Sequence, residues 1–359
     1  MASLIDISQN FQVSGPYNLN KLDWDNPNHR VLAFASLVQG VYVLQTDKEN
    51  NRTTPLAPFW WKFFHYELLD TIMNEKRSHV NGAVYKWKGV PFFKPKNAPL
   101  IVVAFRGTSL DSQATSSDMA VNIRIISNKL HETSRFEAAL VVVKRMIAAY
   151  RLNNICIVGH SLGAALGLLI GRRMAEEGCY LETHLFNPPF ASLPLEMALG
   201  SNAFSRQLRL LHILVTSALA FLLKDLESGR QVSESLKPLD DWFPDLYVNA
   251  NDVICSPYLD YFSVNKHLMI PFEGALAPYA KPFSLRGLLL SMYRTDFTPH
   301  HLIPSARLHV SYMRFDGALE AHYLSSWWST RTAVSTIVAR SGKIQVSNVA
   351  ASIFRNLGS

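Results

Sequence analysis

The chain has few cysteines, and none of them forms a recognisable framework. Its 359 residues include three cysteines, Cys156, Cys179 and Cys255, which lie far apart and show no metal-ligand spacing. This usage predicts free, buried thiols in a reducing compartment rather than disulfides or a zinc site. We therefore expect no metal and no cofactor.

Long apolar runs and basic tracts are also scarce. No apolar stretch reaches the roughly 18–20 residues that cross a bilayer, and residues 1–16 lack the pattern of a secretory signal, so we expect a cytoplasmic protein. There are 35 Lys and Arg against 28 Asp and Glu, a net charge of +7, with no basic run interleaved with aromatic residues. Nucleic acid is therefore not an expected partner, whereas peripheral contact with a membrane surface stays open. No sequence pattern predicts the oligomeric state.

What the chain does contain is a large apolar fraction in alternating strand-like and helix-like segments. Hydrophobic residues make up 48% of the sequence and charged residues 18%, which suits one large domain over residues 1–359. The central segments, alternately strand and helix, are 100–105, 132–150, 154–158, 162–174 and 183–186. This alternation predicts an α/β protein with a doubly wound mixed sheet.

Flanking segments extend this expectation. The apolar stripe over 28–43 predicts a helix within an N-terminal helical segment of about residues 1–80. Residues 83–88 resemble an edge strand, 246–250 and 307–314 resemble later strands, and 333–357 resembles a terminal helix. A cap-like insertion is expected at about 190–240, where the apolar stretch 208–223 predicts either a buried cap helix or a flap that touches lipid.

The strongest motif in the chain is Gly159-His160-Ser161-Leu162-Gly163, between a strand-like and a helix-like segment. Gly-x-Ser-x-Gly at a sharp strand-to-helix turn presents the serine hydroxyl at the edge of a sheet, and side chains in place of the glycines would collide with the neighbouring elements. The free N–H groups at the start of the helix can stabilise a negative oxygen. The segment therefore predicts a nucleophile elbow with Ser161 as the nucleophile.

A nucleophilic serine needs an imidazole base and a carboxylate that orients it, which follow the serine in the chain order Ser, Asp or Glu, His. Asp252, directly after the strand at 246–250, is the preferred acid, and His322, in a loop after the strand at 307–314, is the preferred base. Weaker candidates for these two roles are Asp240, Asp241, Asp245 and Asp260 for the acid, and His300, His301 and His309 for the base.

Ester hydrolysis also needs two donors for the developing oxyanion. The N–H of Leu162, immediately after the nucleophile, is one candidate, and Thr108, in the turn after the strand at 100–105, is the other. Arg106, in the same turn, is expected to brace it rather than to bind substrate.

These motifs together resemble a known family, the fungal-type class 3 lipases. The segments that carry the likeness are Phe105-Arg106-Gly107-Thr108, Gly159-His160-Ser161-Leu162-Gly163-Ala164 and Asn251-Asp252-Val253-Ile254. The resemblance is strongest over about residues 83–260. It implies an α/β-hydrolase fold with the nucleophile at Ser161, the acid at Asp252 and an oxyanion donor at Thr108.

A narrower likeness, to a plant branch of these lipase-like proteins often labelled GDSL esterase/lipase, covers most of the chain. Its segments are Phe11-Gln12-Val13-Ser14-Gly15-Pro16, Leu56-Ala57-Pro58-Phe59-Trp60-Trp61, His184-Leu185-Phe186-Asn187-Pro188-Pro189, and Glu320-Ala321-His322 followed by Trp327-Trp328. It supports His322 as the base, although the sequence contains no Gly-Asp-Ser-Leu. One departure is clear, because fungal-type lipases carry Gly-x-Pro-Arg-Val-Gly where this chain has Asn187-Pro188-Pro189.

Two classes of function follow from these residues. The first is a serine carboxylic-ester hydrolase that acts on small-molecule or lipid esters without a cofactor. The second is a non-catalytic binding or signalling module on a lipase fold, which the resemblance also allows. A thioesterase or an acyltransferase would use the same triad as the first class.

Overall fold

A computed structural model describes most of the chain outside a few segments. The described residues are 9–16, 19, 22–89, 94–108, 123, 127, 130–190, 237–259, 262, 303–315, 320–328, 334–340 and 343–346. The predicted flap at 208–223 and nearly all of the insertion at about 190–240 lie outside them.

The centre of the fold is a mixed sheet in which nine strands lie side by side in chain order within the described residues. They are β1 (Tyr66–Met73), β2 (Val80–Trp87), β3 (Ile101–Phe105), β4 (Ile155–His160), β5 (Glu182–Phe186), β6 (Asp245–Asn249), β7 (Ala306–Ser311), β8 (Val334–Arg340) and β9 (Lys343–Val346). Strands β3 to β7 are parallel to one another, and antiparallel pairs extend the sheet at both ends. The carboxyl ends of β3 to β7 therefore share one edge, where the sequence motifs also fall.

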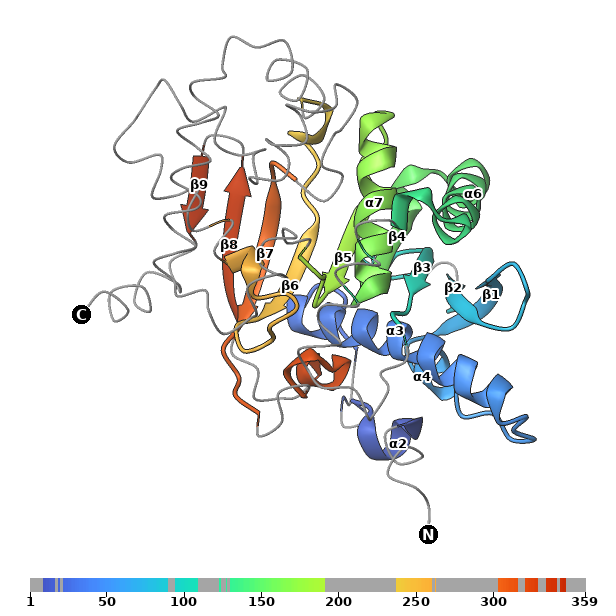
Figure 1. The fold of residues 1–359 in the computed structure, drawn as a ribbon. Helices are drawn as coiled ribbons and strands as arrows, with labels where there is room; N and C mark the ends of the chain where they lie inside the picture. The colour runs from blue at the N-terminus through green and yellow to red at the C-terminus, as the bar shows by residue number, and fades with distance from the viewer. Residues whose placement is uncertain are drawn as a thin grey trace.

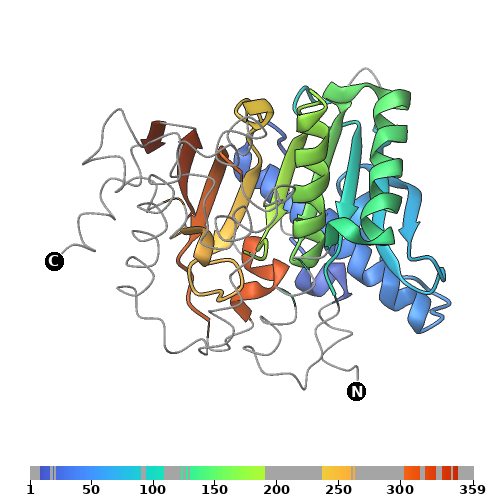
Figure 2. The same ribbon diagram turned by 45° about the horizontal axis from the view of Figure 1, so that its top comes forward.

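Helices cover both faces of this sheet, as Figures 1 and 2 show from two sides. The α-helices are α2 (Phe11–Ser14), α3 (Pro27–Glu49), α4 (Phe59–Lys62), α6 (Ser134–Tyr150) and α7 (Leu162–Glu176). Short 3₁₀ turns are η2 (Leu130–Glu132), η3 (Leu152–Asn154), η4 (Lys237–Leu239), η5 (Glu320–His322) and η6 (Leu324–Trp327). The long helices begin at capping residues: the side chain of Asn26 accepts the N–H of Asn28 in front of α3 at 2.9 Å, and Thr133 caps α6.

Successive side chains of the central strands point to opposite faces of the sheet, which gives the core two layers. Val102 and Val158 point toward α3, whereas Val103 and Ile157 point toward α6 and α7. Each of these strands is buried on both faces and is consequently apolar at nearly every position. Right-handed crossovers from β3 to β4 and from β4 to β5 place α6 and α7 on the same face. Helix α3 covers the opposite face (Figure 1).

Two expectations about strands and helices were wrong. The segment 83–88 is not an edge strand, because β2 pairs with β3 on one side and with β1 on the other. Strand β1 was not expected at all, because it lies inside the segment of about 1–80 that was predicted to be helical. The described part of 333–357 forms β8 and β9, not a helix, because its β-branched residues continue the hydrogen-bonded ladder of β7.

The fold confirms the α/β-hydrolase class, a mostly parallel mixed sheet layered between helices. Within the described part of the chain, no helix combines the length and the apolarity that crossing a bilayer requires.

Candidate active site

Ser161 lies at the strand-to-helix junction that the motif predicted. Strand β4 ends at His160 and α7 begins at Leu162, so Ser161 alone makes the turn, with φ 54° and ψ −127°. Its N–H donates to the carbonyl of Phe186 at the end of β5, at 3.0 Å. A positive φ costs a serine on the order of 1–3 kcal/mol and persists only where the surroundings impose it. The side chain is consequently held at the carboxyl edge of the sheet.

The two glycines of the motif are required by close packing. A Cβ added to Gly159 would come within 2.4 Å of the carbonyl oxygen of Gly163, across the turn. A Cβ added to Gly163 would come within 2.4 Å of the carbonyl oxygen of Phe105, at the end of β3. The elbow therefore fits only because both positions lack a side chain.

Asp252 and His322 meet although 70 residues separate them in the chain. Asp252 follows the carboxyl end of β6, and His322 ends the 3₁₀ turn η5. The imidazole Nδ1 lies 2.7 Å from Oδ2 of the carboxylate, and both residues are buried, at 1% and 0% exposure. The pair has the geometry in which a carboxylate fixes the tautomer and orientation of a histidine.

Further donors hold the Asp252 carboxylate in place. Its Oδ2 accepts the Asn187 side-chain N–H at 2.7 Å and the Cys255 thiol at 3.0 Å, and its Oδ1 accepts the N–H of Ile254 at 2.9 Å. Burial alone would raise the pKa of Asp252, but the charge and hydrogen bond of His322 and the side-chain donors outweigh it and lower the pKa to about 2. Asp252 is therefore ionised throughout the neutral range.

Two buried polar atoms at this edge have no hydrogen-bond partner among the described residues, and both belong to predicted triad members. They are Oγ of Ser161 and Nε2 of His322. The segments that carry them are in contact, because Nε2 of His160, next to Ser161, lies 2.7 Å from the carbonyl oxygen of His322. Unsatisfied buried polar groups are costly and uncommon, and a catalytic role is one of the explanations for them.

A directional chain of hydrogen bonds runs through His160 and joins three segments of the site. Because the His322 carbonyl can only accept, Nε2 of His160 carries the proton, and Nδ1 accepts from the hydroxyl of Tyr42 at 2.8 Å. The Tyr42 hydroxyl in turn accepts the N–H of Gly107 at 2.7 Å. Burial raises the pKa of Tyr42 to about 12 and lowers that of His160, beside His322, to about 3. His160 thus stays neutral with both nitrogens occupied, which makes it unsuitable as the base although it adjoins Ser161.

The turn after β3 runs directly past the serine. A Cβ built on Gly107 would lie 2.9 Å from Cβ of Ser161. Thr108, the predicted oxyanion donor, is the next residue and is half-buried. Leu162, the second predicted donor, opens α7, where the first N–H groups have no acceptor within the helix. Arg106 braces the turn as expected, because its guanidinium donates to the carbonyls of Val80 and Gly107.

The weaker candidates lie elsewhere or outside the described residues. Asp240 and Asp241 precede β6 and Asp245 begins it, so all three are at the opposite end of that strand from Asp252. His309 points from β7 onto the sheet face, where it pairs with Asp245. Asp260, His300 and His301 fall in segments that the structure does not describe.

Three residues of the site were not found by sequence reasoning: Tyr42, Asn187 and Cys255. Tyr42 lies in the middle of α3, more than a hundred residues before the serine, and no local signal marks it. Asn187 carried a signal, since asparagine stood in place of a pattern glycine. Cys255 was recognised only as a buried thiol, and its position three residues after Asp252 was the available clue.

One cluster of metal-ligand type lies on the α3 side of the sheet. Cys156 on β4, with Glu182 and His184 on β5, brings three ligand atoms within 4.8 Å of one another. Protein groups already satisfy it, because Arg30 forms an ion pair with Glu182 and the two nitrogens of His184 bond to Glu182 and Tyr247. The cluster is an internal polar network rather than a vacant cation site.

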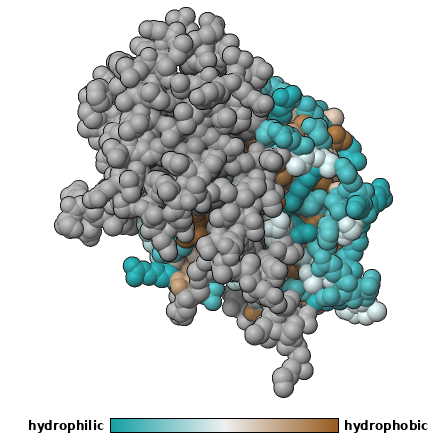
Figure 3. Space-filling model, in the orientation of Figure 1, coloured by the Kyte–Doolittle hydropathy of each residue, from teal (hydrophilic) through white to brown (hydrophobic). Residues whose placement is uncertain are grey.

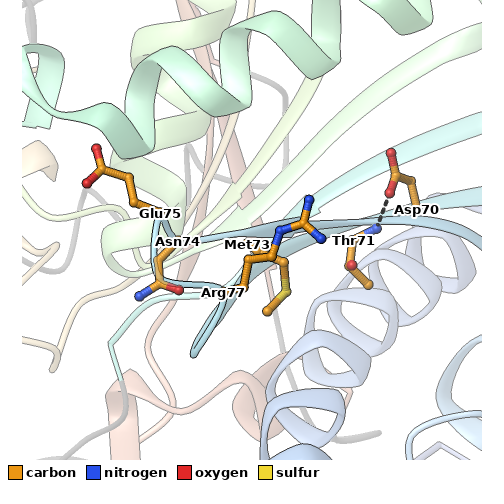
Figure 4. A pocket seen from close by; sticks show the side chains of 6 residues that line it. All are labelled: Asp70, Thr71, Met73, Asn74, Glu75 and Arg77. Carbon is orange, nitrogen blue, oxygen red and sulfur yellow. Dashed lines mark hydrogen bonds between the residues drawn. The ribbon is translucent and has the colours of Figure 1, made fainter.

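A surface hollow of about 400 Å³ lies along the end strand β1 and the turn after it (Figure 4). Its lining residues are Asp70, Thr71, Met73, Asn74, Glu75 and Arg77. Strands β2 and β3 separate β1 from β4, so this mostly polar hollow is remote from Ser161. Figure 3 shows that the described surface on one side of the molecule is mainly hydrophilic, with small hydrophobic areas between.

Comparison with known proteins assigns this fold and elbow to a class of hydrolases. Residues 102–190 match the sequence model of the family described as Lipase (class 3), a span that contains Ser161 but neither Asp252 nor His322. A protein of Arabidopsis thaliana named as a GDSL esterase/lipase is 33% identical over 340 residues, which cover 90% of this chain and 96% of that relative. The chain therefore belongs to the class 3 lipases, in a plant lipase-like branch of that α/β-hydrolase family of lipid-ester hydrolases.

Proposed function

We propose that the protein is a serine carboxylic-ester hydrolase of acyl esters, with Ser161 as the nucleophile, His322 as the general base and Asp252 as the orienting acid. The single observation that carries this proposal is the buried 2.7 Å hydrogen bond between Asp252 and Nδ1 of His322, which leaves Nε2, like the Ser161 hydroxyl, without a partner among the described residues. A base with one nitrogen fixed and the other available is what a serine nucleophile needs.

The proposed reaction proceeds in two halves. Oγ of Ser161 forms a bond to the ester carbonyl carbon as its proton passes to Nε2 of His322, and the carbonyl electron pair moves onto the oxygen. The N–H groups of Thr108 and Leu162 stabilise that oxyanion. Its collapse breaks the ester C–O bond, and the leaving alkoxide takes the proton from His322. Water then repeats the sequence on the acyl-enzyme, which releases the carboxylic acid and restores Ser161.

Several features support a lipid or small-molecule ester as the substrate. The family acts on lipid esters, and no step of this mechanism requires a metal or a cofactor. Peripheral contact with a membrane surface belongs to the same proposal, as does a cytoplasmic location. Neither nucleic acid nor any other macromolecule is required as a substrate or partner.

The decisive experiment compares two serine variants. Ser161→Ala should lower kcat for short-chain p-nitrophenyl esters by a factor on the order of 10⁵–10⁶, and it should abolish labelling by a fluorophosphonate. Ser36→Ala is the matched control, because Ser36 is also buried and its hydroxyl also has no partner within the described part of the chain, but it lies on α3. Equal turnover by wild type and Ser161→Ala would contradict the proposal.

The rival classes are separate outcomes of the same experiment. A wild-type protein that neither hydrolyses esters nor takes up the fluorophosphonate would be a binding or signalling module on a lipase fold. A protein that is labelled at Ser161 but transfers its acyl group to an added alcohol or thiol in preference to water would be an acyltransferase. Preference for thioesters over oxygen esters of the same acyl chain would identify a thioesterase.

A further inference from the structure

Asn187 has an unusual backbone conformation directly after β5. Its φ is 45°, and its N–H donates to the carbonyl of Tyr247 on β6 at 2.8 Å. Glycine adopts this left-handed conformation without cost, and asparagine is one of the few other residues that tolerate it. The fungal-type pattern starts with glycine where this chain has asparagine. The backbone conformation therefore does not require an asparagine side chain. We look for the role of that side chain in its hydrogen bonds.

The Asn187 amide joins three segments of the site. Its Nδ2 donates to Oδ2 of Asp252 at 2.7 Å and to the carbonyl of Ala321 at 3.1 Å. Its Oδ1 accepts the indole N–H of Trp327 at 2.6 Å. The side chain is fully buried, at 0% exposure, so water does not compete for these bonds.

The partners fix which way the amide points. A carboxylate and a carbonyl can only accept, and an indole N–H can only donate, so the nitrogen must face Asp252 and the oxygen must face Trp327. One planar group thus contacts the acid, the residue before the histidine and the turn η6. All three contacts break if the amide turns over.

We infer that Asn187 is a positioning residue, whose amide holds the Asp252 carboxylate against His322 and ties the turn that carries His322 to the same point. This inference rests on the proposed function, since it assigns Asn187 to the hydrolytic site. Asn187 does not touch the reacting atoms, and it acts through Asp252 and Ala321. Its hydrogen bond is also among the interactions that lower the pKa of Asp252 despite burial.

The test is a pair of matched substitutions to glycine. Asn187→Gly removes the amide and keeps the left-handed backbone. Asn51→Gly makes the same change at φ 47°, on an exposed residue after α3, and serves as the control. Asn187→Asp keeps the oxygen that accepts from Trp327 but replaces the donor to Asp252 and Ala321 with an acidic oxygen, so it tests the loss of the donor together with an added acidic group.

We expect Asn187→Gly to lower kcat by a factor on the order of ten to a hundred, with KM within about twofold, because a displaced catalytic group loses its alignment rather than its substrate. Asn187→Asp should lose at least as much. Asn51→Gly should leave all of these values unchanged.

A spectroscopic measurement separates this inference from the proposed function. A low-field proton resonance in the NMR spectrum reports the short hydrogen bond between Asp252 and His322 whether or not the protein turns over esters. It should be present in wild type and in Asn51→Gly, and shifted or lost in folded Asn187→Gly. Loss of the resonance in a protein without esterase activity would sustain the positioning role while the proposed function fails. An unchanged resonance and unchanged kcat in folded Asn187→Gly would overturn the inference.

Discussion

Two aspartate–histidine pairs lie at opposite ends of strand β6, and they differ in whether the histidine keeps a ring nitrogen without a partner among the described residues. Asp245 begins the strand and lies 2.7 Å from Nε2 of His309, while Asp252 follows the strand and lies 2.7 Å from Nδ1 of His322. Nδ1 of His309 is bonded to Thr336 at 3.1 Å, so both of its nitrogens have partners. Nε2 of His322 has none among the described residues.

The surroundings of the two acids sharpen this difference. Asp245 also accepts a two-pronged pair of bonds from Arg307, at 2.7 Å each, and so belongs to a closed ion-pair network. Asp252 accepts from the neutral groups of Asn187 and Cys255, and no arginine pairs with it in the described structure. An aspartate–histidine contact is therefore not evidence of a base by itself. What distinguishes the second pair is that Nε2 of its histidine has no partner among the described residues and that it lies at the carboxyl edge of the sheet, where α/β folds bind ligands.

The largest expected effect comes from breaking the Asp252–His322 pair at the carboxyl edge of the sheet. Asp252→Asn should lower kcat of the folded protein by a factor on the order of 10⁴, because an amide can present a donor to Nδ1 and stabilise the wrong tautomer of His322. The measurement is ester turnover normalised to the folded fraction from circular dichroism. Activity within tenfold of wild type would mean that another residue orients the base.

The next effect comes from breaking the Asp245–His309 pair, which should lower the stability of the fold rather than the activity. Asp245→Asn should lower the free energy of unfolding by about 3 kcal/mol, the lower end for a broken buried ion pair, because the Arg307 side chain is 42% exposed and can turn to solvent. Because no contact of Asp245 reaches the serine, kcat/KM should stay within about threefold. Urea titration and ester turnover on the same preparation give both values.

The pH dependence of that stability has a definite sign. Burial would raise the pKa of Asp245, but His184, Arg307 and His309 outweigh burial and lower it well below the value of about 3.8 expected for an unfolded chain. A lowered pKa gives stability that is complete above about pH 4 and is lost as the pH falls below it. Wild type should therefore lose stability between about pH 4 and 2 more steeply than Asp245→Asn. Parallel curves for the two proteins would contradict this assignment.

The smallest effect tests the chain of hydrogen bonds from Tyr42 to His322. Tyr42→Phe removes the acceptor for the N–H of Gly107 and the donor to His160, so the turn proposed to hold the oxyanion loses its link to His160. We expect kcat to fall by about tenfold, with KM nearly unchanged. Tyr85→Phe is the control, since the buried Tyr85 hydroxyl has no partner in the segments that the structure describes and its loss should be neutral or stabilising. Equal kcat values for the two variants would show that the hydrogen bonds of Tyr42 do not position the site.

Local signals were enough to predict the fold class and the strand-to-helix turn at Ser161. The alternation of apolar strands and amphipathic helices depends on neighbours in sequence, and so does the need for glycine on both sides of Ser161. Chain order then favoured Asp252 and His322, which the structure does bring together. The same reasoning failed for β1, β8 and β9, because the sheet partner that turns a segment into a strand can lie far away in the chain.

The sequence by itself determined the class of this protein, because the Gly-x-Ser-x-Gly motif and the alternation of apolar strands with helices are patterns of residues close together in the sequence. It did not determine which histidine keeps a nitrogen available, since His309 and His322 both follow β6 in the chain and both find an aspartate. Only the tertiary structure decided that, because it sets Thr336 against Nδ1 of His309 and leaves Nε2 of His322 without a partner among the described residues. It also placed the amide of Asn187 and the hydroxyl of Tyr42, because hydrogen bonds between distant segments depend on packing that no local pattern records.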